Sequence, residues 1–285
     1  MNIHYTPKML GPPQAYSPSA HKPQQAVESW LSIAPGLAIL EPDPVSQAQL
    51  RLAHDADFVS DVLAGRLPNG FGNFSPEVAA SLPYTSGAML AAARDAINNG
   101  TVAVAPCSGF HHAGYEHANG YCTFNGLMVT TRVLLEEGVA NRVGILDADM
   151  HYGDGTDDIL ERLRETRIEH CTIGKSYVRP KHADAFFRDL PAILRRFKDC
   201  DVLLYQAGAD PHIDDPLGGW LTTEQLAERD RIVFEHCASR GIPIAWNLAG
   251  GYQTPLRRVL DIHDNTLIEC LRVYEPKGDS GWQAP

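Results

Sequence analysis

The sequence lacks long apolar runs, and no stretch approaches the ~20 apolar residues that a membrane-spanning helix needs. Its first residues, Met-Asn-Ile-His-Tyr-Thr-Pro, lack the basic segment and apolar stretch of a signal peptide. The six cysteines form no C-x-x-C pair, which in a chain of 285 residues indicates reduced thiols rather than a disulfide framework. We therefore expect a soluble, cytoplasmic protein with no membrane partner.

Basic residues are few as well, because 24 Lys and Arg stand against 35 Asp and Glu and give a net charge of -11. A nonspecific nucleic-acid binder usually needs a basic face, so we expect no nucleic-acid partner. The sequence has no repeat and no low-complexity block. The hydrophobic share of 44% and the charged share of 21% are typical of globular proteins. We predict a single domain over residues 1–285, with residues 1–30 largely loop around one short strand.

From about residue 84 onward, short apolar strands alternate with amphipathic helices. The predicted strands cover residues 102–106, 143–146, 168–173, 202–206 and 242–247. The predicted helices cover residues 86–99, 125–137, 154–165, 184–198 with a break near Pro191, 222–240, and a last stretch from about 255 to 271. This alternation indicates an α/β fold with a parallel sheet that helices cover on both faces. In such folds, ligands bind at the carboxyl ends of the strands.

Four of the predicted strands are followed by polar side chains. These are His111-His112 after the first, Asp147-Ala-Asp149-Met-His151-Tyr-Gly-Asp154 after the second, Asp210 after residues 202–206, and Gly250-Gly251-Tyr252 after the last. Because the strands are expected to be parallel, their carboxyl ends should meet at one edge of the sheet.

Two carboxylates and one imidazole suit a divalent metal that keeps an open position. Asp149 and His151 are two residues apart, so in an extended segment they point to the same side. Asp210 arrives from another strand end and supplies a third ligand. A zinc ion held in this way lowers the pKa of a water to roughly 7 and so provides a nucleophile.

The remaining polar residues suit proton transfer. His111 or His112 can accept a proton from water and later donate one to a leaving amine. An imidazole in this role needs a carboxylate on its other nitrogen, and Asp147 and Asp154 are available for it. The Tyr252 hydroxyl can hydrogen-bond a developing oxyanion.

Each of these motifs is ordinary by itself. Asp and His at strand ends often cap helices, a His-His pair is usually incidental, and Gly-Gly-Tyr or Asp-Pro is commonly a turn. Their coincidence at four strand ends favours one shared site over four unrelated structural roles.

Taken together and in this order, the segments resemble the zinc-dependent histone deacetylase superfamily, which also includes acetylpolyamine amidohydrolases and acetoin-utilisation proteins. The chain is similar to a compact bacterial-type member. The segments that carry the resemblance are His111-His112-Ala, Gly120-Tyr121-Cys122-Thr-Phe-Asn125, the stretch from Asp147 to Gly155, Ala-Gly-Ala-Asp210 with Asp215-Pro-Leu217-Gly-Gly, and Gly250-Gly251-Tyr252.

The resemblance implies a three-layer, arginase-like α/β fold with an eight-stranded, mainly parallel sheet. It implies that Asp149, His151 and Asp210 are the zinc ligands. It also implies roles for five catalytic residues. His112 would be the base and acid, His111 its electrostatic partner, Asp147 and Asp154 the orienting carboxylates, and Tyr252 the group that polarises the acetyl carbonyl. It implies that Gly120 and Tyr121 line a narrow tunnel for the substrate stem. It also implies a potassium ion near the metal loop, with Asp147 and Thr172 as oxygen donors.

Two departures from the family pattern bear on the substrate. Many relatives have a basic residue facing an internal channel where this chain has Gln24-Gln25. Relatives usually have a long Gly-rich loop and a further strand after the position of Lys175, whereas this chain passes almost directly to Ala183. We therefore expect an open site, unless Tyr177 or a partner subunit in a homo-oligomer fills the wall.

The resulting hypothesis is a zinc-dependent deacetylase, a hydrolase of linear amides, acting on an acylated lysine or acetylated amine. Leu217 stands where polyamine-selective relatives tend to have an acidic residue, and this favours an acyl-lysine-like substrate. An acetylpolyamine or other small N-acetyl compound is the alternative. An arginase-type ureohydrolase shares the fold, but it requires two manganese ions and the order Asp-x-His-x-Asp in the metal loop, where this chain has Asp-x-Asp-x-His. A non-catalytic acyl-lysine binder should have lost Tyr252 or a metal ligand, and this chain has both.

Overall fold

The sheet at the centre of the molecule has seven strands, all paired in parallel, in the order β2-β1-β3-β7-β6-β4-β5. A computed structural model describes residues 1–12 and 16–275. The strands are β1 (Asn2–His4), β2 (Ala38–Leu40), β3 (Val102–Val104), β4 (Val143–Asp147), β5 (Ile168–Thr172), β6 (Val202–Gln206) and β7 (Ile244–Asn247). The expected parallel α/β architecture is confirmed.

The strand number differs from the expectation, since the sheet has seven strands and not eight. Between β5 and the next helix, the chain forms only two short 3₁₀ turns, Ile173–Lys175 and Pro180–His182. This stretch is too short to hold another strand and its return. β5 is therefore the edge of the sheet on this side.

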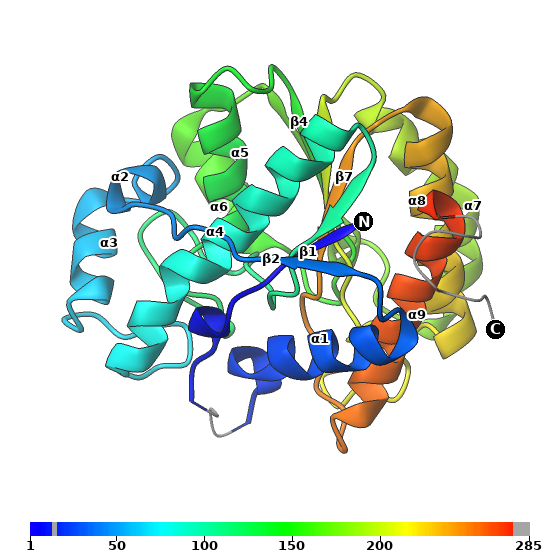
Figure 1. Cartoon of the computed structure of the whole chain (residues 1–285), viewed down its shortest axis with the longest axis horizontal. Helices are drawn as coiled ribbons and strands as arrows, with labels where there is room; N and C mark the ends of the chain where they lie inside the picture. Colours follow the sequence, from blue (N-terminus) through cyan, green and yellow to red (C-terminus); the bar gives the residue numbers. More distant parts are fainter. Residues whose placement is uncertain (13–15, 276–285) are drawn as a thin grey trace.

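Helices cover both faces of the sheet (Figure 1). One layer contains α1 (Lys22–Ile33), α7 (Ala183–Leu194), α8 (Thr223–Arg240) and α9 (Arg257–Tyr274). The other contains α3 (Ala56–Leu63), α4 (Pro76–Asn99), α5 (Gly126–Glu136) and α6 (Asp154–Leu163), with the short α2 (Gln47–Leu50) beside them. Alternate residues of a strand face opposite layers. In β3, Val102 and Val104 accordingly pack toward the first layer, while Ala103 packs toward the second.

The first thirty residues hold more structure than expected. The short strand is present as β1, but it is an inner strand of the sheet rather than part of a surface loop. The helix α1 begins at Lys22, with Pro23 in its first turn, where proline is tolerated. Its buried Ala26, Val27 and Trp30 follow a helical spacing, and the Trp30 ring lies 5.2 Å from that of Trp246 in β7. The Pro-, Ser- and Gln-rich composition concealed this apolar stripe.

Two helices, α4 and α7, each continue through an internal proline. α4 begins at Pro76, not at residue 86, because Ser75 caps it and the helix continues through Pro83. α7 likewise runs through Pro191 to Leu194 and is followed by the 3₁₀ turn Arg195–Phe197. A long helix buried on one face accommodates the lost hydrogen bond through its packing.

The register of the sheet sets where the polar side chains meet. Thr172, Asp147, Gln206 and Asn247 form a row across the four neighbouring strands β5, β4, β6 and β7. The loops that follow these strands, and the loop after β3 on the other side of β7, therefore leave the sheet at one edge. The candidate site lies there.

Candidate active site

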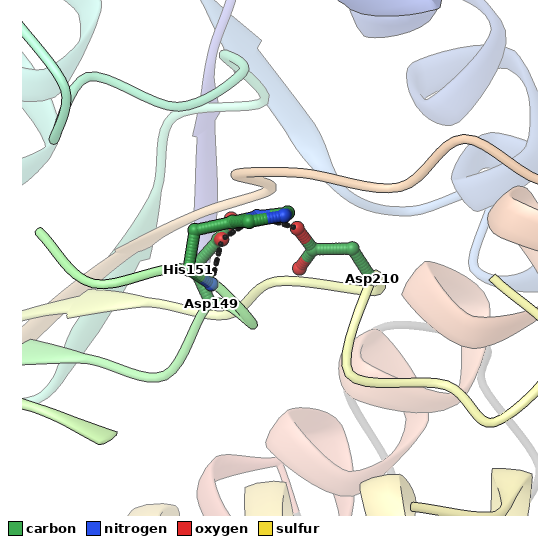
Figure 2. Close-up of side chains that lie close together, drawn as sticks. All are labelled: Asp149, His151 and Asp210. Atoms are coloured by element: carbon green, nitrogen blue, oxygen red, sulfur yellow. Dashed lines mark hydrogen bonds and ion pairs between the residues drawn. The ribbon is translucent and has the colours of Figure 1, made fainter. Parts of the chain in front are cut away.

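The structure brings Asp149, His151 and Asp210 together, as Figure 2 shows. One ligand atom from each residue lies within 4.8 Å of the others. Asp149 and Asp210 are buried, whereas the His151 side chain is 32% exposed and borders the pocket. The three predicted metal ligands thus form one cluster with an accessible side.

The donor set of this cluster fits a divalent cation. His151 Nδ1 lies 3.0 Å from Asp210 Oδ2 and 3.2 Å from Asp149 Oδ1, so a single ring nitrogen faces two carboxylates. Hydrogen bonds to Asp149 and Asp210 raise the pKa of His151 to about 11, and burial together with the Asp149 carboxylate raises the pKa of Asp210 to about 7. Two buried carboxylates at this separation repel each other unless a cation lies between them. A zinc-like ion with two carboxylates and one imidazole satisfies that requirement.

Gly250 lies close to the carboxylates of Asp149 and Asp210. A Cβ atom on Gly250 would lie 2.3 Å from Asp210 Oδ2 and 2.8 Å from Asp149 Oδ2. The Gly250 N–H donates to Asp149 Oδ2 at 2.9 Å, which fixes the orientation of this ligand. Any larger residue at this position would displace the two carboxylates.

His111 is buried beside the cluster. Its Nδ1 lies 2.7 Å from Asp147 Oδ2, and its Nε2 lies 3.6 Å from Asp149 Oδ1. Burial alone lowers the pKa of His111, but the Asp147 and Asp149 carboxylates outweigh it and raise the value to about 9. The two carboxylates thus favour the protonated, positively charged form of His111.

His112 is the more accessible imidazole and lines the pocket. Its Nδ1 lies 2.6 Å from Asp154 Oδ1, and its ring centre lies 4.1 Å from that of His111. Burial and the charge of His111 lower the pKa of His112, while Asp154 opposes that shift. Since the Asp154 carboxylate accepts from Nδ1, the other ring nitrogen, Nε2, is left free of this contact.

Tyr252 also borders the pocket, in the loop that follows β7. Burial, followed by the charges of Asp210 and Asp149, raises the pKa of its hydroxyl well above the usual range. These effects favour the protonated hydroxyl, which can donate a hydrogen bond. Its backbone N–H donates to Asp215.

The pocket itself has a volume of about 170 Å³. Its lining includes all three residues expected to contact substrate, together with residues of the metal and proton-transfer groups: Gly120, Tyr121, Leu217, His111, His112, Asp149, His151 and Tyr252. Ser19, Gly109, Cys122 and Gly250 complete it. Sequence reasoning missed Ser19, which the fold brings from the N-terminal segment to the site.

Gly120 and Tyr121 adopt a backbone conformation that side chains rarely take. Their φ angles are +53° and +64°. A Cβ on Gly120 would lie 2.4 Å from the His112 ring, so only glycine fits here. Tyr121 accepts the strain of the left-handed region, with its N–H bonded to Gly70 O at 3.0 Å and its ring 5.8 Å from that of Tyr252. Strained residues of this kind concentrate at functional sites.

The contacts of Asp147 and Thr172 give no support to the predicted potassium ion. Asp147 Oδ1 accepts from Gln206 Nε2 at 2.8 Å, and its Oδ2 bonds His111. The Thr172 hydroxyl accepts from the Gly153 N–H at 3.1 Å. Asp147 therefore orients His111, and Thr172 holds the loop between the metal ligands and α6.

A basic residue does lie behind the site, but it is Lys22 rather than a residue at the Gln24-Gln25 positions. Lys22 is fully buried, and its Nζ donates to Ala249 O at 2.6 Å and lies 3.4 Å from Gly250 O. Burial lowers its pKa to about 8, although Asp210 and Asp149 oppose the shift. The lysine at the start of a helix gave no sequence signal, because its partners are carbonyls 227 and 228 residues away.

Tyr177 does not fill the pocket. Its ring stacks on Trp220 at 6.1 Å and packs against Phe186, and its hydroxyl donates to Asp189 at 2.9 Å. The side chain is part of the packing beneath α7 and does not belong to the lining of the pocket.

The family model for the histone deacetylase domain matches residues 18–173 and 174–267. These two segments cover most of the chain and include every residue of the site described above. The chain belongs to the histone deacetylase family.

Known proteins are similar to this chain over stretches of different length. An uncharacterized protein of Picosynechococcus sp. is 28% identical over 244 residues, covering 75% of this chain and 80% of that protein. Histone deacetylase 2 of Arabidopsis thaliana is 26% identical over 255 residues, covering 78% of this chain and 65% of the plant protein. Acetylpolyamine amidohydrolase 1 of Pseudomonas aeruginosa is 48% identical over 52 residues, which are 18% of this chain and 15% of that protein.

Solved structures of the family share the fold. The HD domain of HDA15 superposes with a TM-score of 0.77 at 20% identity, covering 99% of this chain and 91% of that domain. The acetylpolyamine aminohydrolase of Burkholderia pseudomallei gives a TM-score of 0.74 at 17% identity, covering 96% and 99%. Among residues 1–12 and 16–275, this histone deacetylase family member has no helix long and apolar enough to cross a membrane.

Proposed function

We propose that this chain is a zinc-dependent amidohydrolase that removes an acetyl or similar acyl group from an acyl-lysine-like amine. The observation that carries the proposal is the meeting of the Asp149–His151–Asp210 cluster with His112 and Tyr252 at one pocket. Zinc bound by the three ligands supplies Lewis acidity, which activates water and polarises an amide carbonyl. Family membership supports hydrolysis of an amide as the reaction.

His112 is the proposed proton carrier. Asp154 fixes its orientation through Nδ1, and its lowered pKa leaves Nε2 unprotonated at neutral pH. It can take the proton of the attacking water and return it to the amine as the C–N bond breaks. His111, charged and 4.1 Å away between ring centres, keeps His112 from being protonated too early and stabilises the negative charge that develops.

Tyr252 is the proposed donor to the carbonyl oxygen. Its hydroxyl stays protonated, so it can donate to the oxyanion of the tetrahedral intermediate. Its backbone is held by Asp215 and by the Gly250-Gly251 turn.

The rim of the pocket supports a substrate with an uncharged stem. Leu217, 38% exposed, and Tyr121 border the pocket and offer no carboxylate to a distant ammonium group. An acyl-lysine side chain fits this lining. A small acetylated amine, including an acetylpolyamine, is the second candidate. It is supported by the 48% identity over 52 residues to acetylpolyamine amidohydrolase 1 of Pseudomonas aeruginosa.

The test is a hydrolysis assay of zinc-loaded protein with acetyl-lysine peptides, longer acyl-lysine peptides and acetylspermidine. We expect activity that a chelator abolishes and zinc restores, with acetyl-lysine peptides turned over faster than acetylspermidine. Tyr252→Phe should lower kcat by ~10²- to 10³-fold while zinc still binds. Intact activity in that variant would contradict the role of Tyr252, and equal or better turnover of acetylspermidine would favour the second candidate.

Metal analysis separates the remaining alternatives. One zinc-like ion per chain is expected, whereas an arginase-type ureohydrolase would hold a manganese pair. Binding of acetyl-lysine peptide without release of acetate would indicate a non-catalytic binder.

A further inference from the structure

A buried arginine lies behind the metal cluster and is not part of the chemistry proposed above. Arg229 of α8 has no exposed surface. Its Nη1 donates to Ala148 O at 3.0 Å and to Gly208 O at 2.9 Å. Ala148 directly precedes the ligand Asp149, and Gly208 lies two residues before the ligand Asp210. One nitrogen thus bonds both ligand-bearing loops.

These two carbonyls lie beyond the ends of their strands. β4 ends at Asp147 and β6 at Gln206, and the bond from Ala148 N to Gln206 O, at 3.0 Å, extends their pairing by one step. A buried carbonyl needs a donor once the strand pairing has ended. The guanidinium provides one donor to both loops and so sets the distance between them.

The charge of Arg229 is balanced where it lies. Its Nε donates to Asp230 Oδ1 at 2.8 Å, and Asp230 also accepts from the hydroxyls of Tyr205 and, at 2.6 Å, Thr266. All four side chains are buried. Because the ion pair is locally neutral, its effect on a cation at Asp149 and Asp210 comes through geometry rather than through net charge.

The Arg229 bonds differ from the backbone hydrogen bonds that reach the ligand carboxylates themselves. Met150 N donates to Asp210 Oδ1 at 3.1 Å, and Gly250 N donates to Asp149 Oδ2 at 2.9 Å. Both of these bonds use carboxylate oxygens, which a metal competes for. The Arg229 bonds use backbone carbonyls and leave all ligand oxygens available.

We propose that Arg229 is a positioning residue that holds the Asp149 and Asp210 loops in metal-binding register before the ion arrives. The inference rests on the proposed metal site. Outer residues that orient metal ligands typically change metal affinity by about 10- to 100-fold when they are replaced. Arg229 would act on the affinity and on the coordination geometry, and through them on catalysis.

The experiment compares the full chain with Arg229→Met, Arg229→Lys and the control Thr266→Val. Thr266→Val removes a bond to the same Asp230 but touches neither loop. Zinc affinity is measured by competition with a chromophoric chelator, the ligand field by the visible absorption of Co²⁺-loaded protein, and the fold of the metal-free chains by circular dichroism and Tm. None of these readouts depends on catalytic activity.

We expect Arg229→Met to weaken zinc binding by at least ~10-fold and to alter the Co²⁺ spectrum. Thr266→Val should lower the metal-free Tm but keep zinc affinity within about 2-fold, because the carbonyl bonds remain. Folded Arg229→Met with unchanged zinc affinity and Co²⁺ spectrum would overturn the inference. So would a Thr266→Val control that loses affinity to the same degree, since metal binding would then follow network stability alone.

If Arg229→Met does not fold, Arg229→Lys decides. Lysine keeps the charge but lacks the planar fork, so one of the two loops or Asp230 loses its donor. Weakening of zinc binding by about 3-fold or more supports the proposal, and affinity equal to that of the unaltered chain overturns it. Failure of the proposed function looks different, because the unaltered chain would then bind no zinc or release no acetate.

Discussion

Asp215 accepts a hydrogen bond from the backbone N–H of Tyr252, with Oδ2 2.8 Å from the nitrogen. Its other oxygen, Oδ1, accepts from the Leu217 N–H at 3.0 Å. One nearly buried carboxylate therefore fixes both the loop that carries the proposed oxyanion donor and the loop that forms the rim. Neither bond is visible in the sequence, where Asp215 stands out only as part of the Asp215-Pro-Leu217-Gly-Gly segment.

Asp215→Ala should lower kcat by on the order of 10- to 100-fold, because the Tyr252 loop loses its anchor and a small displacement misplaces the hydroxyl. KM should change as well, since Leu217 borders the substrate. Steady-state kinetics on an acetyl-lysine peptide measure both. Asp214→Ala, a change of the neighbouring exposed acid, is the matched control and should leave both constants nearly unaltered. Equal effects of the two changes would show that Asp215 has no special role.

Asp154→Asn should move the acid limb of the kcat/KM profile to lower pH. Burial and His111 lower the pKa of His112, whereas the Asp154 hydrogen bond and the Asp149 charge raise it. Without the Asp154 carboxylate the pKa falls further, so the base stays unprotonated in more acidic solution. The less basic, less oriented imidazole should also lower the maximal rate. A pH–rate profile checks both effects, with Glu161→Gln on the same helix as the charge control. A limb that moves to higher pH contradicts the assignment.

Lys22→Met should alter how the stability of the metal-free chain depends on pH. The folded pKa of Lys22, about 8, lies below its ordinary value of 10.5, so between these values the unfolded chain binds more protons. The free energy of unfolding of the unaltered chain should rise with pH relative to the variant, by about 1 kcal/mol from pH 7 to pH 9. Urea unfolding of both chains at the two pH values measures the difference. A constant or opposite difference would place the folded pKa elsewhere.

Leu217→Glu should shift substrate preference toward polycations. A carboxylate at the rim pairs with a distant ammonium, which the present leucine cannot do. The ratio of kcat/KM for acetylspermidine to that for an acetyl-lysine peptide should rise by roughly 10-fold, about 1.4 kcal/mol. Leu217→Gln, of similar shape but uncharged, is the control. If both variants change the ratio equally, charge is not what selects at this position.

The sequence predicted the residues that form the site better than it predicted the buried residues that hold the site loops in place. Each strand end delivers its residues through local connectivity, so Asp149, His151, Asp210, His112 and Tyr252 could be assigned to one sheet edge before the sheet was known. Their clustering is confirmed by the geometry, whereas their catalytic roles stay predictions.

The supporting residues were missed for a physical reason. Lys22 and Arg229 bond backbone carbonyls, and any residue has a carbonyl, so no motif marks the partners. A buried cation also looks like an exposed one when only its own helix is considered. The eighth strand was inferred from the resemblance alone. The connection after β5 forms only two short turns and holds no further strand.

Two short turns follow β5 in place of an eighth strand, so β5 is an edge strand. The unpaired backbone of an edge strand is a place where another molecule can add a strand. Side chains obstruct this border. Glu169 is held by Arg142 at 3.1 Å and by Arg196 at 2.8 Å, and Arg196 Nη2 also donates to His170 O at 2.9 Å. A strand that pairs with the β5 backbone at His170 would have to displace Arg196 from this carbonyl. The sheet is thus one strand narrower than expected, while Arg196 hinders the pairing of another strand with β5.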